Sequence, residues 1–410
     1  MVVNRKTMNP ADLGSLPAWQ VNEGQEHKKG SATAPDFVPV DSASPALQHV
    51  AGWLKTASKA SALEDCTLIV PTCKRPREMA GLLRLLATFS DVPREVIVVD
   101  GSPSSEVENE LFPWAEKSSP PFDLVFIRSP AGLTRQRNVG IDASSREFVF
   151  FLDDDSVPRP GYFRAVRQVF VSDTAKEIGA VRGFLEKGQS GSMNWLWRAR
   201  FALGIVPRGE PGQYLSCGTT ATWDTTATWE GVRPFKDLKP VDVLIGCAMA
   251  FRRAVFEKHR FSLFFSGYSQ GEDLEMSRRV ARDWKLVVCG EARVRHEAAG
   301  EGRPDGFRRG RMALRNHYFI WKRHVPRISV LDRVRFWLNA VLIIIYHTTG
   351  AFVRGFRPRH LSYAAGTFCA AIECLFVPPA YEEPPARREY AFNLRPVACE
   401  VLSPEARPPA

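Results

Sequence analysis

The sequence predicts an α/β protein built on a doubly wound sheet of the nucleotide-binding type. Three observations carry this prediction: short apolar runs alternate with helical patterns, polar turns follow those runs, and an acid triplet ends one of them. Runs that are apolar throughout are typical of parallel strands buried on both faces. Ligands of such sheets gather beyond the carboxyl ends of the strands, so the polar turns mark the expected site.

Strand and helix signals alternate along the chain from residue 66. Apolar runs at 66–70, 96–99, 124–127 and 148–152 predict strands, and leucine or mixed helical patterns at 79–89 and 134–143 predict helices between them. A helix is expected over 162–170, followed by a Trp- and Gly-rich stretch at 191–231 without clear period. Apolar residues at 241–252, a helix over 273–282 and a strand at 286–288 are expected to complete the sheet and build an acceptor cleft.

The two ends of the chain differ from this middle part. Residues 1–62 read as a flexible arm with one short amphipathic helix over 45–63, residues 63–325 as the globular domain, and residues 379–410 as a disordered tail. Between them, residues 326–378 form an apolar helical segment. Its uncharged part at 336–353 is 18 residues long, the lower edge for a membrane span. Because Glu373 interrupts the second apolar stretch, a packed or interfacial helical hairpin is as plausible as two spans.

Composition restricts the partners and the compartment. The 410 residues carry a formal net charge of +10, which attracts phosphate-bearing substrates, acidic membrane surfaces or nucleic acid. No zinc-finger, RNP or homeodomain pattern is present, so nucleic acid is not the expected partner. Eight cysteines lack a regular framework and the first residues lack an apolar signal core, which together indicate a cytosolic protein with reduced thiols.

The acid triplet Asp153, Asp154 and Asp155 directly follows an apolar run. Like charges at the end of a buried strand are costly unless a cation lies beside them. Hard divalent cations take oxygen ligands and keep positions for water or phosphate oxygens. The triplet therefore favours a metal-bridged phosphate substrate over a solvated acidic turn.

Other polar residues are candidates for the same site. Asp100 ends a strand and can accept hydrogen bonds from a base or ribose, although an Asp-Gly-Ser turn needs no ligand. Arg135 and Asn138 share a helix face, whereas Arg137 is expected to be a solvated helix charge. Asp273 at a helix start is either a cap or a general base, and His296 is either an ordinary histidine or a ligand that suits manganese.

Five segments occur in one order: PTCKR at 71–75, VVDGS at 98–102, GLTRQRNVG at 132–140, LDDD at 152–155 and GED at 271–273. Their order and content resemble family 2 glycosyltransferases of the GT-A fold over roughly residues 65–325. The resemblance implies a mostly parallel central sheet flanked by helices, here with a C-terminal helical extension that associates with a membrane. It also implies inverting, metal-dependent transfer from a nucleotide-diphospho-sugar to a hydroxyl, with Mn²⁺ or Mg²⁺ as the cation.

By this resemblance the residues take specific roles. The nucleoside pocket is formed by Pro71, Thr72, Arg75 and Asp100, with Arg135 and Asn138 nearby. The metal and ribose-diphosphate motif is formed by Asp153 and Asp155, Asp154 also binds the donor, and Asp273 is the catalytic base. His296 resembles the metal-ligating histidine of galactofuranosyl- and rhamnosyltransferase-like members, and residues 246–252 resemble the lining of the donor and acceptor cleft.

Three readings of the function follow from these features. The first is a glycosyltransferase of hexosyl or rhamnosyl type, acting on a lipid-linked or cell-envelope glycan at the cytoplasmic face of a membrane. A basic run over 308–335 ahead of the apolar segment favours that location. A sugar nucleotidyltransferase and a non-catalytic, membrane-associated carbohydrate-binding protein are the alternatives. The processive-synthase element Gln-x-x-Arg-Trp is not evident after Asp273, which favours transfer of single sugars.

Overall fold

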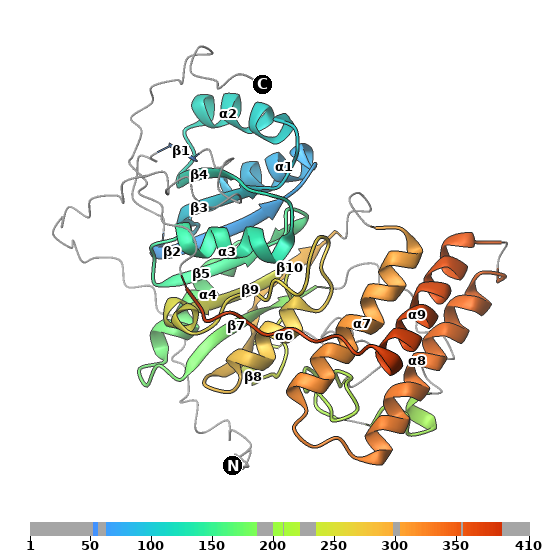
Figure 1. The fold of residues 1–410 in the computed structure, drawn as a ribbon. Helices are drawn as coiled ribbons and strands as arrows, with labels where there is room; N and C mark the ends of the chain where they lie inside the picture. The colour runs from blue at the N-terminus through green and yellow to red at the C-terminus, as the bar shows by residue number, and fades with distance from the viewer. Residues whose placement is uncertain are drawn as a thin grey trace.

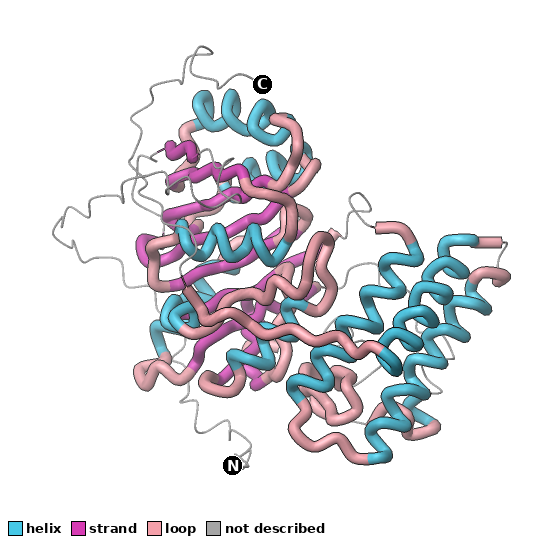
Figure 2. Tube along the Cα trace, in the orientation of Figure 1, coloured by secondary structure: helices cyan, strands magenta, loops and turns pink. Residues whose placement is uncertain are grey.

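A computed structural model describes residues 52–55, 63–186, 200–207, 209–221, 235–297, 304–353 and 356–387. Its centre is one sheet with helices on both faces (Figures 1 and 2). The strands are β1 (Gly52–Lys55), β2 (Leu63–Thr72), β3 (Pro93–Asp100), β4 (Asp123–Arg128), β5 (Phe148–Leu152), β6 (Ser156–Pro158), β7 (Ile178–Leu185), β8 (Leu238–Pro240), β9 (Ala248–Arg252) and β10 (Lys285–His296). They follow the order β1-β4-β3-β2-β5-β9-β7-β10-β6, and β8 pairs with β10 off this path.

The sheet has a parallel half and a mixed half. Strands β4, β3, β2 and β5 run parallel, so Thr72 and Asp100, which pair across β2 and β3, end at the same edge. The expectation of a mostly parallel sheet is wrong for the other half, where β9 runs antiparallel to both β5 and β7. The chain reaches β9 only after the long excursion beyond β7, and it enters the sheet from the opposite end.

Helices cover both faces of the sheet (Figure 1). On one face lie α1 (Pro76–Leu86), α2 (Glu106–Ser118) and α4 (Tyr162–Ser172), which pack on Leu68, Val70 and their neighbours. On the other lie α3 (Leu133–Ala143), the short 3₁₀ helix η3 (Arg253–Glu257) and α6 (Glu272–Val280), which pack around Ile69. Alternate residues of β2 thus enter opposite cores, as a strand apolar throughout requires.

The predicted elements of the central domain are confirmed. The expected strands at 66–70, 96–99, 124–127 and 148–152 lie within β2, β3, β4 and β5, and the expected helices at 79–89, 134–143, 162–170 and 273–282 correspond to α1, α3, α4 and α6. The expected strand at 286–288 lies within the longer β10. Most of the Trp- and Gly-rich stretch at 191–231 lies outside the described residues.

The helix expected over 45–63 is wrong where the chain is described. Residues Gly52–Lys55 instead form β1, which pairs antiparallel with β4 from Gly52 opposite Ile127 to Lys55 opposite Leu124. Without β1, the outer edge of β4 would present unpaired backbone groups, and pairing with an edge strand satisfies them. The predicted flexible arm therefore contains a strand of the sheet, and the rest of it, at 1–51 and 56–62, lies outside the described residues.

Three long helices form a layer beside the sheet: α7 (Gly306–His324), α8 (Val330–Gly350) and α9 (Pro358–Phe376) (Figure 1). Helices α8 and α9 form a hairpin, one of the alternatives that the sequence left open, and meet α7 through a small apolar core in which Trp321 stacks on Phe336 at 4.3 Å. No helix in the described parts of the chain combines the length and the apolar character needed to cross a bilayer.

The tail expected to be disordered begins with an ordered stretch. After α9, residues 379–387 run back over the sheet domain (Figure 1), where Arg323 donates a hydrogen bond to the carbonyl of Tyr381 at 3.0 Å. The Tyr381 ring lies 6.0 Å from that of Phe264. These contacts tie the end of the helical layer to the domain that holds the cleft, and residues 388–410 lie outside the described part.

Candidate active site

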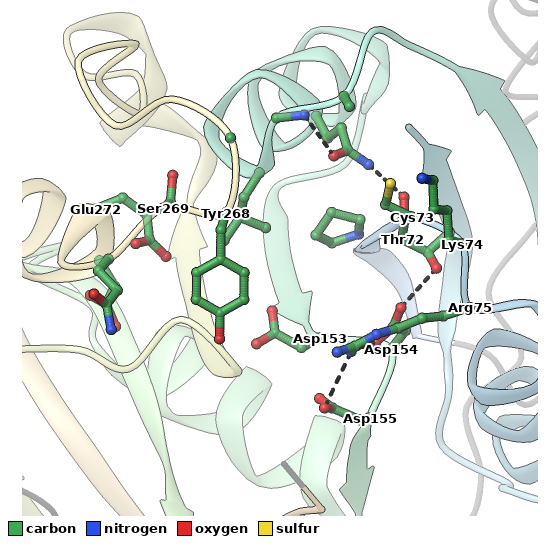
Figure 3. Close-up of a pocket in the computed structure, with 18 of the residues that line it drawn as sticks. Thr72, Cys73, Lys74, Arg75, Asp153, Asp154, Asp155, Tyr268, Ser269 and Glu272 are labelled. Atoms are coloured by element: carbon green, nitrogen blue, oxygen red, sulfur yellow. Dashed lines mark hydrogen bonds and ion pairs between the residues drawn. The ribbon is translucent and has the colours of Figure 1, made fainter. Parts of the chain in front are cut away.

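One cleft lies at the carboxyl edge of the parallel strands. It has a volume of about 590 Å³ and two walls (Figure 3). One wall is formed by residues after β2 and β5, including Thr72, Arg75 and the acid triplet, and the opposite wall by the loop and helix start at 267–273. Tyr268 projects between the walls in Figure 3. The sheet topology thus collects segments far apart in sequence around one space, as expected for this class of sheet.

Asp153, Asp155 and His296 form a cluster in this cleft. One potential ligand atom from each lies within 4.8 Å of the others, and His296 Nε2 is 3.0 Å from Asp155 Oδ1. Pairing of β10 with β6 produces this arrangement, because His296 stands opposite Ser156, the residue after the triplet. Two carboxylates and an imidazole are a donor set that suits manganese and related divalent cations. The residues therefore fit the metal that the sequence predicted.

Asp154 points away from that cluster. Its carboxylate accepts hydrogen bonds from the Thr72 hydroxyl at 2.7 Å and from Arg75 at 2.8 Å (Figure 3). Burial raises the pKa of Asp154 to about 6, although Arg75 and Thr72 oppose this shift. The triplet forms a turn after β5, in which Asp153 and Asp155 face the cluster while Asp154 joins this turn to the end of β2.

Arg137 lies beneath the cleft floor and is fully buried, so its prediction as a solvated charge is wrong. It donates to Glu272 at 2.9 Å and to Asp153 at 3.2 Å, and its remaining contacts include the carbonyl of Gly246 at 3.3 Å. Its guanidinium also lies over the Phe261 ring, 5.2 Å from the centroid. One cation therefore links the acid triplet on one wall to the helix start on the other.

The acids Glu272 and Asp273 begin α6. The pKa of Glu272 is raised to about 7 by burial and by the charge of Asp273, against the opposing effect of Arg137. Asp273 is only half-buried and lines the cleft, and its carboxylate accepts hydrogen bonds from the backbone of Gly246 at 2.9 Å and of Leu274 at 2.8 Å. Two fixed backbone donors hold this carboxylate at the cleft opposite the metal cluster.

Not every predicted residue reaches the cleft. Pro71, Thr72 and Arg75 line it, and their role in binding the nucleoside stays a prediction. Asn138 is buried on α3 and exchanges two 2.9 Å hydrogen bonds with the backbone of Phe261, so it fixes a loop instead. Arg135 lies on α3 outside the lining of this cleft.

Asp100 is also buried outside the lining, with one carboxylate oxygen bound by Ser102. Its other oxygen, Oδ2, is buried without a hydrogen-bond partner within the described residues. The proposed binding of the nucleoside by Asp100 therefore stays a prediction.

Sequence reasoning missed three residues that shape the site: Gln136, Arg137 and Tyr268. Gln136 donates to the carbonyls of Thr72 at 2.7 Å and Val99 at 2.8 Å and so joins α3 to two strand ends. Charge balance could have identified Arg137, since five acids at 153–155 and 272–273 in one site require buried cations. Nothing in the local sequence distinguishes Tyr268.

A mixed α/β sheet whose carboxyl edge collects acids around a cleft is the architecture of nucleotide-binding α/β enzymes. Residues 67–260, slightly less than half of the chain, match the family described as Glycosyl transferase family 2. This match agrees with the resemblance to family 2 glycosyltransferases, and it does not reach the rhamnosyl or galactofuranosyl subtype. No curated protein sequence matches the chain.

Similar solved structures include the mannosyltransferase PcManGT from Pyrobaculum calidifontis in complex with GDP-Man and Mn²⁺, at 16% identity and a TM-score of 0.46, covering 85% of this chain and 91% of that one. GalNAc-T7 with UDP, GalNAc and Mn²⁺ gives 13% identity and a TM-score of 0.45, covering 76% of this chain and 56% of that one. TarS from S. aureus in complex with UDP-GlcNAc gives 16% identity and a TM-score of 0.41, covering 71% of this chain and 74% of that one. Likenesses at these scores do not establish what this chain binds.

Proposed function

We propose that this protein transfers a sugar from a nucleotide-diphospho-sugar to an acceptor hydroxyl, with inversion at the anomeric carbon and with dependence on a divalent cation. One observation carries the proposal: the cluster of Asp153, Asp155 and His296 and the carboxylate of Asp273 lie on opposite walls of one cleft. A donor bound between the walls would have its diphosphate at the cluster and its sugar toward Asp273.

Each group in the cleft has a definite task in this reaction. Asp153, Asp155 and His296 would hold Mn²⁺ or Mg²⁺, which when bound supplies Lewis-acid stabilisation of the charge on the leaving diphosphate. Asp273 accepts the proton of the acceptor hydroxyl as its oxygen bonds to the anomeric carbon. The bond to the diphosphate breaks on the opposite side and its electron pair leaves with the nucleotide, so one displacement inverts the centre.

Asp273 is a better candidate base than its neighbour Glu272. Glu272 is buried and its carboxylate is paired with Arg137, whereas Asp273 is more exposed to the cleft. A general base must lie within hydrogen-bond reach of the proton that it removes. The half-exposed carboxylate of Asp273 meets this requirement.

We further propose a hexosyl donor, with the rhamnosyl or galactofuranosyl type as its narrower form, and a lipid-linked or cell-envelope glycan acceptor at the cytoplasmic face of a membrane. His296 in the cluster supports the narrower donor class. The excess of Lys and Arg in the C-terminal helices supports a location beside anionic lipid.

The test combines binding and turnover. Nucleoside diphosphates should raise the melting temperature more with Mn²⁺ than without, because a ligand of the native state stabilises it by mass action. Asp273→Asn should lower kcat by about 10²–10⁴-fold, the usual contribution of a general base, and leave this thermal shift intact. The control is Asp305→Asn at the N-cap of α7, where either residue caps the helix.

Two results would contradict the proposal. A broad panel of nucleotide-sugars that gives neither transfer nor hydrolysis with Mn²⁺ or Mg²⁺ would exclude the reaction. Parental turnover in Asp273→Asn would exclude the assigned base and leave the reaction class standing.

A further inference from the structure

Helices α8 and α9 expose an apolar face that no described part of the chain covers. In the described residues, 15 of the 19 exposed large hydrophobic side chains fall within 330–377. On α8 they recur at helical spacing at Leu331, Val334, Leu338, Val341 and Ile345, and on α9 at Leu361, Phe368, Ile372 and Leu375. Residues three and four apart share one side of a helix, so each helix carries an apolar stripe.

The ends of the hairpin extend this face. Phe352 and Phe356, between the two helices, are 63% and 65% exposed, and Phe376 at the end of α9 is 79% exposed. The opposite sides of the helices are already used, because Phe336, Ala340 and Ala370 are buried against α7. The hairpin therefore has one side fixed to protein and one apolar side toward solvent. We call the exposed side the apolar face.

Positive charge is concentrated in the same layer. Residues 304–377 contain 12 Lys and Arg against 3 Asp and Glu, a difference of +9, while the whole chain has a net charge of +10. The three acids offset only part of this charge: Asp305 pairs with Arg308, Glu373 pairs with Arg311, and Asp332 is buried in the cap of α8. Exposed arginines at 333, 357 and 359 lie on α8 or at the start of α9.

This combination decides between possible occupants. A second copy of the chain would bring an equally basic layer against the first, and like charges at an interface oppose association. An anionic bilayer meets both requirements, because its acyl region accepts the apolar side chains and its headgroups attract the arginines. Since neither helix has the length and apolar character to cross, the hairpin would lie in the plane of the interface.

The apolar face is also fixed relative to the cleft. Asn316 of α7 donates to the carbonyl of Gln270 in the cleft wall at 2.9 Å, and Phe319 and Ile320 share a core with Leu274 of α6. Helix α7 thus connects the hairpin of α8 and α9 to the cleft wall. Any surface on which α8 and α9 dock therefore lies at a fixed position relative to Asp273.

We propose that the apolar face of α8 and α9 docks on the surface of an anionic lipid bilayer, with Phe352, Phe356 and Phe376 inserted among the acyl chains and the arginines at the headgroups. Binding of this kind needs no sugar donor. Its test is therefore separate from that of the proposed transferase activity, and either can fail alone.

The experiment measures co-sedimentation of the full chain with vesicles of phosphatidylcholine alone or mixed with phosphatidylglycerol. The parent should bind the mixed vesicles and lose affinity as salt is raised, because headgroup attraction is screened. Phe352→Ser with Phe376→Ser should lower the partition coefficient at least about tenfold, since each exposed ring loses its apolar burial. The matched control is Val171→Ser on α4, which is exposed on the sheet domain.

A second variant tests the charge. Arg333, Arg357 and Arg359 changed together to Gln should weaken binding by about fivefold for each arginine near the surface. The control changes Arg84, Arg159 and Arg164, whose side chains are 51–55% exposed on the sheet domain, to Gln in the same way. Equal binding to both kinds of vesicle, or equal losses in variants and controls, would overturn the proposal. So would a stable dimer that the two phenylalanine substitutions dissociate while the parent ignores vesicles.

Discussion

Arg137 shows how one buried side chain can hold an active site together. It is fully buried between Asp153 and Glu272, and Gly246 leaves it room because a Cβ there would lie 2.8 Å from its Nη2. A buried cation of this kind is costly by itself and is stabilised by its two acids. Glu272 depends on it in turn, since its buried carboxylate would otherwise lack this cationic partner, whereas Asp153 is partly exposed to the cleft.

Replacing Arg137 by an uncharged residue should therefore destabilise the folded protein strongly. Arg137→Met is expected to lower the free energy of unfolding by about 3–5 kcal/mol, the cost of breaking a buried ion pair. Arg135→Met, on the same helix but half-buried and outside the cleft, should change it by about 0.5 kcal/mol or less. Urea denaturation of the two variants measures both values, and similar losses in the two would show that Arg137 does not have this role.

The residues that sequence could and could not predict differ in how their positions are set. The acid triplet and Asp273 follow directly from local signals, an apolar run and a helix start. Arg137 could not be placed, because a helix charge is solvated unless both helix faces are covered, and coverage of α3 by the loop at 261–267 is a tertiary fact. The prediction that Asn138 lies beside the nucleoside pocket failed for the same reason, since its hydrogen-bond partners are backbone groups of that loop.

At the scale of elements, the close contact of α7 with α9 depends on two glycines, Gly310 and Gly366, which have no side chain at the contact. A Cβ at Gly310 would lie 2.1 Å from the carbonyl oxygen of Tyr363, and one at Gly366 would lie 2.0 Å from that of Phe307. The two helix backbones therefore approach each other more closely than any larger residue permits. This close approach gives the helical layer its compact side, opposite the apolar face.

A substitution at this contact has a clear control. Gly310→Ala should destabilise the protein by about 1–3 kcal/mol, the range for overpacking, because backbone must move. Gly81→Ala in α1 has nothing within 4 Å of its new Cβ, so it should stabilise the protein by up to about 1 kcal/mol through helix propensity. Thermal unfolding of both variants gives the comparison, and a stabilising effect at Gly310 would contradict the packing.

The junction of α6 and α7 contains a buried acid and a buried histidine. Arg282 donates to Nδ1 of His324, so Nε2 carries the proton that is directed at Glu275, 3.3 Å away. Burial alone would raise the pKa of Glu275, but the hydrogen bond from His324 and the charge of Arg279 hold it below its usual value. Burial lowers the pKa of His324, which Glu275 opposes only in part.

Both shifts predict that this junction weakens in acid. A carboxyl whose folded pKa is depressed contributes stability above its unfolded pKa, and this contribution is lost as pH falls through the folded value. A histidine with a depressed pKa takes up its proton more readily when unfolded, so stability also falls below about pH 6.5. Urea midpoints between neutral and acid pH should therefore decline, and Glu275→Gln should flatten the decline at its acid end. An unchanged slope in this variant would exclude Glu275 as its source.

The presence of a strand or helix was predictable where the local sequence pattern determines it. It was not predictable where pairing with another strand determines it. The strands and helices from β2 to β5 have apolar runs long enough to define them. In contrast, Gly52–Lys55 became a strand only because β4 offers an open edge, and β9 runs antiparallel because of the path by which the chain returns. Neither edge nor path is encoded in the residues of these strands alone.

At the scale of the whole molecule, charge is divided between two regions. Acids gather at the cleft, whereas the helical layer carries nearly the whole net charge of the chain. A cation at the cleft would neutralise part of the acid cluster and should therefore stabilise the folded state. The sheet domain and the C-terminal helices are distinct in composition, and contacts of α7 and of residues 379–387 join them.

Binding of a divalent cation should stabilise the whole folded protein. Mn²⁺ at about one hundred times its Kd should add about 2.7 kcal/mol to stability, seen as a higher melting temperature that EDTA reverses. His296→Ala should remove most of this gain, whereas His360→Ala on α9, away from the cleft, should leave it intact. An equal gain in the parent and in His296→Ala would show that the histidine is not a ligand.

The pairing of β10 with β6 has a consequence for synthesis of the protein. His296 is the last residue of the last strand, and the acids that it joins were translated more than 140 positions earlier. A nascent chain on the ribosome carries the acid triplet long before the imidazole emerges, so the complete ligand set exists only once β10 has docked. Metal capture would thus mark the end of sheet assembly in a newly made molecule.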